Sequence, residues 1–389
     1  MTDLLRKSIL DAADTVVVKI GTRSLTAPNG ALDEAQVVSV ADQVAAVVES
    51  GRRVVLVSSG AVGAGIARLG LTSRPTDLAQ LQAVAAVGQS HMMEAYNRTL
   101  EVHGLHAAQV LLTAADLNHR RRYLNIRNTL ASLFEWGAVP IINENDTVRT
   151  YELRQTFGDN DRLAALVTNL IRAPLLVLLT DVEGLYDGDP ASESSRVIPT
   201  VERIDDATMS FAGGTAANAG LRLSTGGMGS KLEAARIATE AGEHVVLANG
   251  RRPGVLMDLL AGEPVGTLFL AEGESVSSRK RWIGWTVQPA GTLTLDAGAV
   301  RAVVSGGSSL LAVGVKRLTG DFKLGDIVAL SDESGVEVAR GLTNYSADDL
   351  RMIAGQPSES FAGILGRCPY SEVIHRNNLV LIGKARTGC

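Results

Sequence analysis

Short, almost wholly apolar runs recur along most of the chain, and each is followed by a stretch with helical character. Runs of this length that are rich in Val, Ile and Leu are typical of strands buried on both faces, as in a parallel sheet between helices. Their alternation with helices predicts an α/β fold with an open, mostly parallel sheet sandwiched by helices. The predicted strands are residues 15–21, 53–57, 108–112, 138–142, 175–179 and 244–248.

Two polar clusters stand close together in the middle of the chain. Residues 143–146 (Asn-Glu-Asn-Asp) end the apolar run at 138–142, and residues 158–161 (Gly-Asp-Asn-Asp) open a helical stretch. Since such groups are costly to bury unpaired, we expect them at the carboxyl edge of the sheet, where open α/β sheets bind ligands. Turn and helix-cap roles are the alternative. The proximity of the clusters favours a site, with residues 147–156 as a hairpin over the crevice.

Two lysines and two glycine-containing loops predict sites that bind an anion. Lys19 lies at the exit of the first strand beside Gly21, and Lys231 follows a glycine-rich stretch on the first turn of a helix. Residues 58–65 form a second loop of small residues before a helix. Backbone N–H groups and cations at such places bind anions. The chain lacks a Walker A motif and a G-x-G-x-x-G fingerprint, so the pattern favours phosphoryl transfer without a P-loop and disfavours NAD binding.

The length of 389 residues predicts more than one domain. We expect an α/β domain over residues 1–270, a polar linker at 271–281, a small β-barrel-like domain at 282–375 and a poorly ordered tail at 376–389. The β domain is predicted from short alternating runs separated by glycine turns. These runs are residues 291–295, 309–313, 327–330 and 336–339.

Composition excludes several classes of protein. The net charge of −5 gives no global attraction to nucleic acid or an anionic membrane. Cys368 and Cys389 form no metal-binding spacing and no disulfide framework, and the histidines form no hydrolase motif. The polar N-terminus is not a signal peptide, and no apolar run matches a membrane span. A cytoplasmic protein is therefore expected. The basic run at 119–122 is interpreted as a solvated helix face.

Several of these segments together resemble the glutamate 5-kinases, a branch of the amino acid kinase family. The resemblance runs in order through about residues 15–270, and a second resemblance, to the PUA domain, covers parts of the C-terminal region. It implies ATP-dependent phosphorylation of the side-chain carboxylate of L-glutamate to L-glutamyl 5-phosphate, the first step of proline biosynthesis, with Mg²⁺. The segments are residues 18–22, 58–61, 140–146, 158–161, 179–181, 184–186 and 225–231, and then 307–314, 325–326 and 339–342.

The resemblance also implies roles for particular residues. Lys19 and Lys231 would neutralise phosphate charge during transfer, and Asp161 would hold both lysines in place. Ser59, Asp146 and Asn160 would bind glutamate. No protein ligand of Mg²⁺ is predicted. The nucleotide would be held by Lys19, Thr180, Asp181, Thr225, Gly226, Gly227, Met228, Gly229, Ser230 and Lys231.

Other functions are also compatible with these residues. Another family member would phosphorylate N-acetylglutamate, aspartate, carbamate or UMP, although Asp146 suits a free α-ammonium. An RNA-binding role through the PUA domain is disfavoured, because acidic residues outnumber basic ones between residues 282 and 375. The family further implies proline as a feedback inhibitor, a homo-oligomer (tetramer or dimer) and glutamyl-phosphate reductase as a downstream partner.

Overall fold

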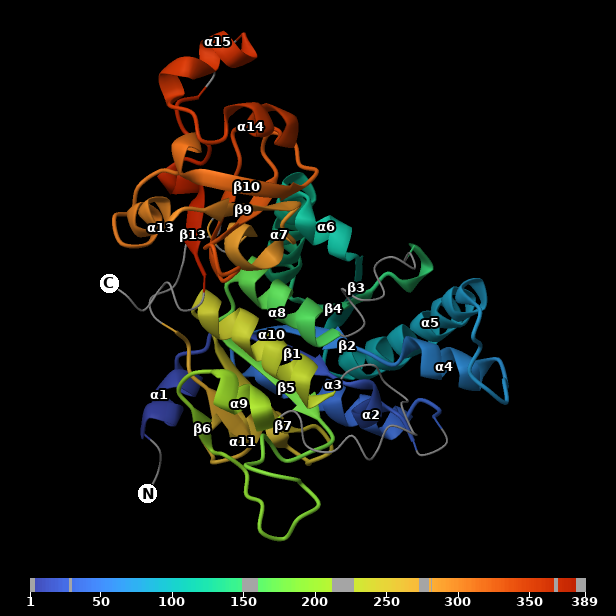
Figure 1. Cartoon of the computed structure of the whole chain (residues 1–389). Helices are drawn as coiled ribbons and strands as arrows, with labels where there is room; N and C mark the ends of the chain where they lie inside the picture. The colour runs from blue at the N-terminus through green and yellow to red at the C-terminus, as the bar shows by residue number, and fades with distance from the viewer. Residues whose placement is uncertain are drawn as a thin grey trace. The chain divides into compact units, whose positions relative to one another are not determined.

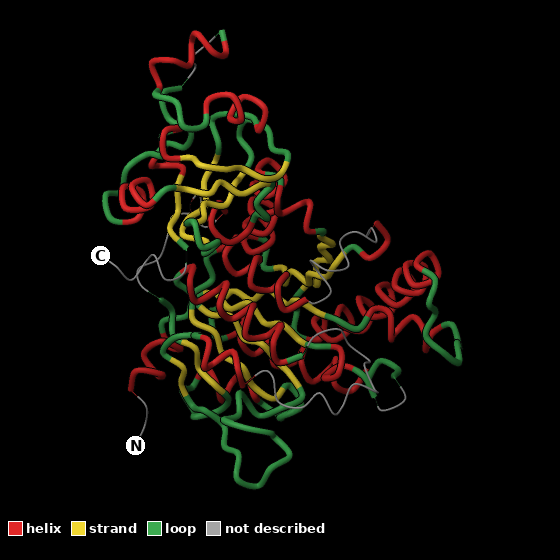
Figure 2. Tube along the Cα trace, viewed as in Figure 1, coloured by secondary structure: helices red, strands yellow, loops and turns green. Residues whose placement is uncertain are grey.

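The computed structural model describes residues 4–27, 30–148, 160–211, 227–272, 280, 282–366 and 370–382. The chain divides into two compact units, Met1–Ser275 and Val276–Cys389. Most of the linker predicted at 271–281 lies outside the described residues. In the first unit, strands lie between layers of helices (Figure 1 and Figure 2).

The first unit is built on one eight-stranded sheet with the order β3-β4-β2-β1-β5-β7-β8-β6. All neighbours from β3 to β7 are parallel, whereas β7 and β8 are antiparallel. The predicted open, mostly parallel sheet is confirmed. The strands are β1 (Thr15–Ile20), β2 (Arg53–Ser58), β3 (His106–Leu112), β4 (Ala138–Glu144), β5 (Leu175–Thr180), β6 (Thr200–Val201), β7 (His244–Asn249) and β8 (Thr267–Phe269).

Helices cover the two faces of this sheet. On one face, α1 (Leu4–Asp11), α3 (Glu34–Glu49), α5 (Leu78–Val102) and α11 (Val255–Leu260) share an apolar core with alternate strand residues. On the other face lie α7 (Arg120–Glu135), α8 (Asn160–Ile171) and α10 (Met228–Ala241), with α8 and α10 side by side (Figure 1). No helix in the described ranges is both long and apolar enough to cross a membrane.

Side-chain alternation along β1 determines where its lysine points. Val16, Val18 and Ile20 all belong to the core shared with α3 and α5. Because successive residues of a strand face opposite sides of the sheet, Lys19 points to the side covered by α8 and α10. A lysine inside a buried strand is thus delivered to the helical layer that carries the second polar cluster.

Two glycines bring α4 (Ala61–Arg68) and α5 into backbone contact. A Cβ atom at Gly88 would lie 1.8 Å from the Ala61 carbonyl oxygen, and one at Gly65 would lie 1.9 Å from the Val84 carbonyl oxygen. The small residues at 58–65 therefore serve close helix packing as well as the turn before α4. This contact holds the start of α4, two residues after Ser59, against α5.

Gly88→Ala is expected to lower the free energy of unfolding by about 2–3 kcal/mol, because its methyl group must push two helical backbones apart. Denaturant unfolding followed by circular dichroism would measure the change. Gly363→Ala is the matched control, since a Cβ atom at that helical glycine meets nothing within 4 Å. Equal stability of the two variants would show that the α4–α5 contact is not close in solution.

The second unit contains its own sheet of five strands, with the order β10-β9-β11-β12-β13. Its separate apolar core includes Leu293, Phe322, Val328 and Leu330. The predicted small C-terminal β domain is confirmed as a second sheet. Its strands are β9 (Gly291–Leu295), β10 (Val315–Gly320), β11 (Ile327–Ser331), β12 (Glu337–Leu342) and β13 (Leu379–Leu381).

Two sequence predictions differ from the structure here. Residues 309–313 form an isolated bridge at Leu310 and then a 3-10 turn at Ala312–Gly314, not a strand. Leu310 and Ala312 are buried while Leu311 and Val313 are exposed, so the alternation reflects burial without strand pairing. Part of the predicted tail, Leu379–Leu381, pairs with β12 because Leu379 and Val380 have apolar side chains to bury. Residues 383–389 lie outside the described residues.

Candidate active site

The lysines of the two glycine-containing segments meet at one carboxylate. Lys19 Nζ forms an ion pair with Asp161 Oδ1, and Lys231 Nζ donates to Asp161 Oδ2 at 3.1 Å. Asp161 is 0% exposed, and the side chains of Lys19 and Lys231 are 2% and 9% exposed. The structure therefore brings together all three residues that the sequence predicts as catalytic.

Local structure explains this convergence. Lys19 leaves the carboxyl end of β1 on the face covered by α8 and α10. Asp161 lies on the first turn of α8, and Lys231 lies on the first turn of α10. Ser230 adds a hydroxyl group that donates to Asp161 Oδ2 at 3.1 Å. Two helix N-termini and one strand end thus deliver their side chains to one point.

The charges at this point suit an anion. Lys19 and Lys231 bring two positive charges and Asp161 one negative charge, and burial strengthens their electrostatic interactions. Asp161 is favourably placed at a helix N-terminus, whereas Lys231 adds its charge to the positive end of the α10 dipole. A phosphate group would interact favourably with both ammonium groups and with the first N–H groups of α10.

A second cluster of polar side chains lies next along the same sheet edge. The two hydrogens of Asn160 Nδ2 are shared among three acceptors: Ser59 Oγ at 2.9 Å, the Ser58 carbonyl oxygen at 2.9 Å and Asn143 Oδ1 at 2.8 Å. Asn160 precedes Asp161 at the start of α8, so this cluster adjoins the lysines. Two predicted substrate residues, Ser59 and Asn160, are therefore in direct contact.

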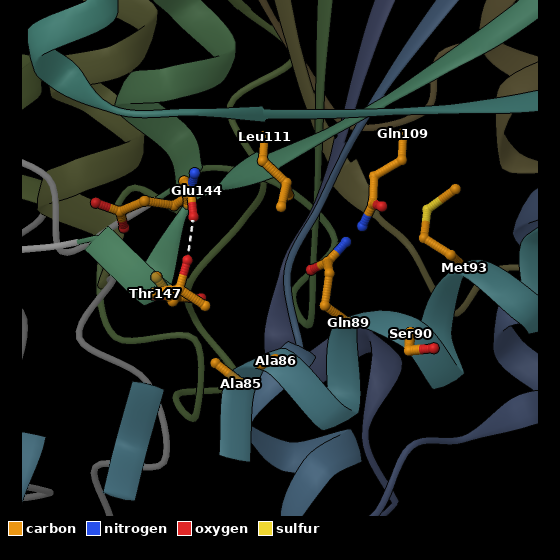
Figure 3. A pocket seen from close by; sticks show the side chains of 11 residues that line it. Ala85, Ala86, Gln89, Ser90, Met93, Gln109, Leu111, Glu144 and Thr147 are labelled. Carbon is orange, nitrogen blue, oxygen red and sulfur yellow. Dashed lines mark hydrogen bonds between the residues drawn. The ribbon is translucent and has the colours of Figure 1, made fainter. Parts of the chain in front are cut away.

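Asp146, the third predicted substrate residue, begins the 3-10 turn Asp146–Val148 after β4. It lines a pocket of about 320 Å³ between α5, β3 and the end of β4 (Figure 3). In the figure, Gln89 and Gln109 point into this pocket from α5 and β3. The lining residues are Ala85, Ala86, Gln89, Ser90, Met93, Gln109, Leu111, Glu144, Asn145, Asp146 and Thr147.

Of the predicted nucleotide residues, Thr180 ends β5, the neighbour of β1, and Asp181 follows it. Burial raises the pKa of Asp181, but hydrogen bonds from its own backbone N–H and the Thr180 hydroxyl, with Arg23 nearby, hold that pKa below its usual value. Arg23 Nη1 lies 3.3 Å from Asp181 Oδ2. No sequence motif marks Arg23, which becomes a neighbour of Asp181 through the pairing of β1 with β5.

Other predicted positions divide between described and undescribed residues. Gly227 is the N-cap residue of α10, and Met228 and Gly229 begin the helix just before Ser230 and Lys231. Thr225, Gly226 and Asp159 lie outside the described residues, as does most of the predicted hairpin at 147–156. Within the described ranges, no three His, Cys, Asp or Glu side chains are grouped so as to hold a metal ion.

Sequence reasoning missed the residues behind this edge of the sheet. Ser58 Oγ and Tyr96 Oη, on β2 and α5, lie 3.0 Å apart in the core, and burial raises the pKa of Tyr96 well above its usual value. Tyr96 therefore stays protonated and holds the end of β2. Asn143 Nδ2 donates to Gln89 Oε1 at 2.7 Å. No sequence motif marks Tyr96 or Gln89, because both lie within an ordinary amphipathic helix.

An α/β sheet whose carboxyl edge gathers two lysines around one aspartate is suited to binding a phosphate group, as a phosphotransferase requires. Residues 14–249 match the amino acid kinase family, and residues 291–365 match the PUA domain. The chain belongs to the amino acid kinase family.

Relatives match nearly the whole chain. A protein of Rhodopirellula baltica named glutamate 5-kinase is 48% identical over 377 residues, covering 97% of this chain and 96% of the relative. Glutamate 5-kinase of Chromohalobacter salexigens is 47% identical, covering 97% and 98%. Glutamate 5-kinase of Pseudomonas fluorescens is 46% identical, covering 97% and 100%. The resemblance seen in the motifs is thus confirmed over both units.

Proposed function

We propose that this protein transfers the γ-phosphoryl group of ATP to the side-chain carboxylate of L-glutamate, giving L-glutamyl 5-phosphate for proline biosynthesis. The observation that carries the proposal is the convergence of Lys19 and Lys231 on Asp161, beside the Ser59–Asn160 pair. The relatives named glutamate 5-kinase, at 46–48% identity over almost the full chain, support the same substrate.

The chemistry requires charge neutralisation more than proton transfer. A glutamate side chain is ionised at neutral pH, so the nucleophile needs no general base. The barrier comes from bringing a carboxylate towards a polyphosphate, and the two ammonium groups offset that repulsion. Lys19 would bind phosphate oxygens, Lys231 would neutralise the transferring group, and Asp161 would keep both ammonium groups in position.

The nucleotide would lie over β5 and the start of α10, held by Thr180, Asp181 and residues 225–231. Mg²⁺ would neutralise part of the phosphate charge. Mg²⁺ in kinase sites is bound by substrate phosphates and water oxygens together with one or two carboxylates.

Glutamate would be oriented by groups of complementary charge. The Asp146 carboxylate suits the α-ammonium group, and the Ser59 hydroxyl with nearby backbone N–H groups suits the α-carboxylate. An acetylated amine would gain nothing from Asp146, which separates glutamate from N-acetylglutamate. The side-chain carboxylate would then point towards Lys231.

Asp146→Asn is expected to raise the KM for glutamate by about 10- to 100-fold, because a charge-assisted bond to the ammonium becomes a neutral one. The KM for ATP should stay nearly unchanged. Steady-state kinetics with each substrate varied would measure both constants. Glu94→Gln, which alters an exposed carboxylate on α5, is the control. A rise in both KM values would remove Asp146 from glutamate binding.

The substrate is tested by trapping the acyl phosphate with hydroxylamine. Wild-type protein with ATP and Mg²⁺ should give hydroxamate with L-glutamate, and far less with L-aspartate or N-acetyl-L-glutamate. Failure with glutamate but turnover of another acid or of UMP would assign the chain to another activity of the family. Adding proline to the same assay tests feedback inhibition, and light scattering tests the proposed homo-oligomer.

The product suggests where the activity operates. Acyl phosphates react readily with water, so an enzyme that consumes L-glutamyl 5-phosphate, glutamyl-phosphate reductase, is the proposed downstream partner. A cytoplasmic location is proposed from the supply of ATP and glutamate there.

A further inference from the structure

A line of amide side chains joins α5 to the proposed glutamate site. Gln89 Oε1 accepts from Asn143 Nδ2 at 2.7 Å, and Asn143 Oδ1 accepts from Asn160 Nδ2 at 2.8 Å. Asn160 Nδ2 also donates to Ser59 Oγ at 2.9 Å. Gln89 and Asn143 are 7% and 3% exposed, so water competes little for these bonds. Four side chains from α5, β4, α8 and the turn after β2 thus form one relay.

Main-chain groups fix the direction of this relay. The Glu144 N–H group donates to Asn143 Oδ1 at 2.8 Å, so the oxygen of that amide must face the Glu144 backbone. Its NH₂ group therefore points the other way and needs an acceptor. At the far end, the Ser58 carbonyl oxygen accepts from Asn160 Nδ2, which fixes the second amide in the same way. Neither asparagine can turn over without placing like groups together.

This direction decides what the site offers to a ligand. Ser59 Oγ accepts from Asn160, so the hydroxyl proton is directed elsewhere and can be donated to a carboxylate. The Asn160 Oδ1 atom takes no part in the relay and can accept from an ammonium group. The relay therefore presents a donor and an acceptor in the arrangement that an α-amino acid requires.

We propose that Gln89, which does not itself belong to the catalytic or substrate-binding groups, is a positioning residue for glutamate and acts through Asn143. The inference rests on the proposed function. Gln89 supplies the acceptor that holds the Asn143 amide, and its helix is fixed against α4 by the adjacent Gly88. Figure 3 shows the Gln89 side chain at the wall of the pocket that Asp146 also lines.

Replacing Gln89 should therefore change the orientation of the Ser59 and Asn160 side chains. Gln89→Met keeps the length of the side chain but removes the acceptor, leaving the buried Asn143 NH₂ group unsatisfied. If that amide turns over instead, its NH₂ group faces the NH₂ group of Asn160. Either outcome disorders the relay, and we expect the KM for glutamate to rise by about 10- to 100-fold. The KM for ATP should change by less than about threefold.

The experiment compares Gln89→Met with Glu94→Gln, which changes an exposed side chain on α5 that lies outside both the pocket and the relay. Hydroxamate formation gives KM for glutamate and for ATP, and thermal melting reports folding. Glu94→Gln should behave as wild type. In the double variant Gln89→Met with Ser59→Ala, the glutamate effect should be clearly smaller than the product of the single effects, because both act through one relay.

The measured KM values decide whether Gln89 acts through the relay. An unchanged KM for glutamate in folded Gln89→Met, an equal rise for ATP, or effects that multiply in the double variant would overturn the proposal. Gln89→Glu keeps an acceptor oxygen and should hold the KM for glutamate within about threefold of wild type. If Gln89→Met does not fold, a rise above about tenfold in Gln89→Glu overturns the proposal instead. A wild-type protein inactive with glutamate would refute the proposed function, and the relay would then be tested on the acid that the enzyme does use.

Discussion

Lys231→Ala should reduce kcat by about 100- to 1,000-fold while the fold stays intact. The ammonium group lies on the first turn of α10, in contact with Asp161, where positive charge would meet the transferring phosphoryl group. Removing one preorganised donor from such a site costs about 2.7–4 kcal/mol in transition-state stabilisation. The fold should survive because Asp161 keeps its ion pair with Lys19. Hydroxamate formation at saturating substrates measures kcat, and thermal melting checks folding.

A matched control separates this effect from a general loss of positive charge. Lys316→Ala removes an exposed lysine that pairs with Glu333 on the second unit, and its kcat should equal that of wild type. Lys231→Arg tests geometry, since a planar guanidinium keeps the charge but cannot replace a compact ammonium in a packed site. A kcat for Lys231→Ala within a few-fold of wild type would exclude Lys231 from the reaction.

The parallel sheet was predictable because its strands are buried on both faces. That burial makes each strand a continuous apolar run, and the runs at β1, β2, β5 and β7 match the structure closely. The gathering of polar residues at one edge was predictable for a related reason, because parallel strands end at the same edge of a sheet. The pairing of Lys19 with Asp161 was implied only by the family resemblance, since Asp161 opens a helix and does not end a strand.

The residues that support the site could not be predicted in this way. Gln89 and Tyr96 lie within α5, and neither interrupts its apolar periodicity in a way that marks a partner. Their contacts with Asn143 and Ser58 depend on how closely α5 approaches the sheet. That distance, like the glycine contact between α4 and α5, is a property of packing and not of local pattern.

The strand at Leu379–Leu381 was missed for a third reason. Only three residues pair with β12, and the apolar run that contains them, residues 379–382, is too short to show alternation. Its stability comes from a neighbouring strand already in place. Short edge strands are therefore recognised from the sheet that they join.

Asp161→Asn is expected to lower the free energy of unfolding by about 3–5 kcal/mol, as when one partner of a buried ion pair is removed. The substitution keeps the shape of the side chain but leaves two buried ammonium groups without their shared counter-charge. Denaturant unfolding without ligand measures the loss. Asp258→Asn is the control, because that carboxylate pairs with Arg252 on the surface, where such pairs contribute about 1 kcal/mol or less.

The same variant shows whether the lysines face the nucleotide. If Lys19 and Lys231 both bind phosphate, ATP should replace part of the missing negative charge, and the rise in melting temperature on adding ATP should be larger in Asp161→Asn than in wild type. Catalysis should nevertheless stay low, because phosphate contacts alone do not restore the positions that Asp161 imposes on the two ammonium groups. An equal rise in both proteins would show that the lysines serve stability and not the triphosphate. The measurement thus separates a structural ion-pair cluster from a phosphate site.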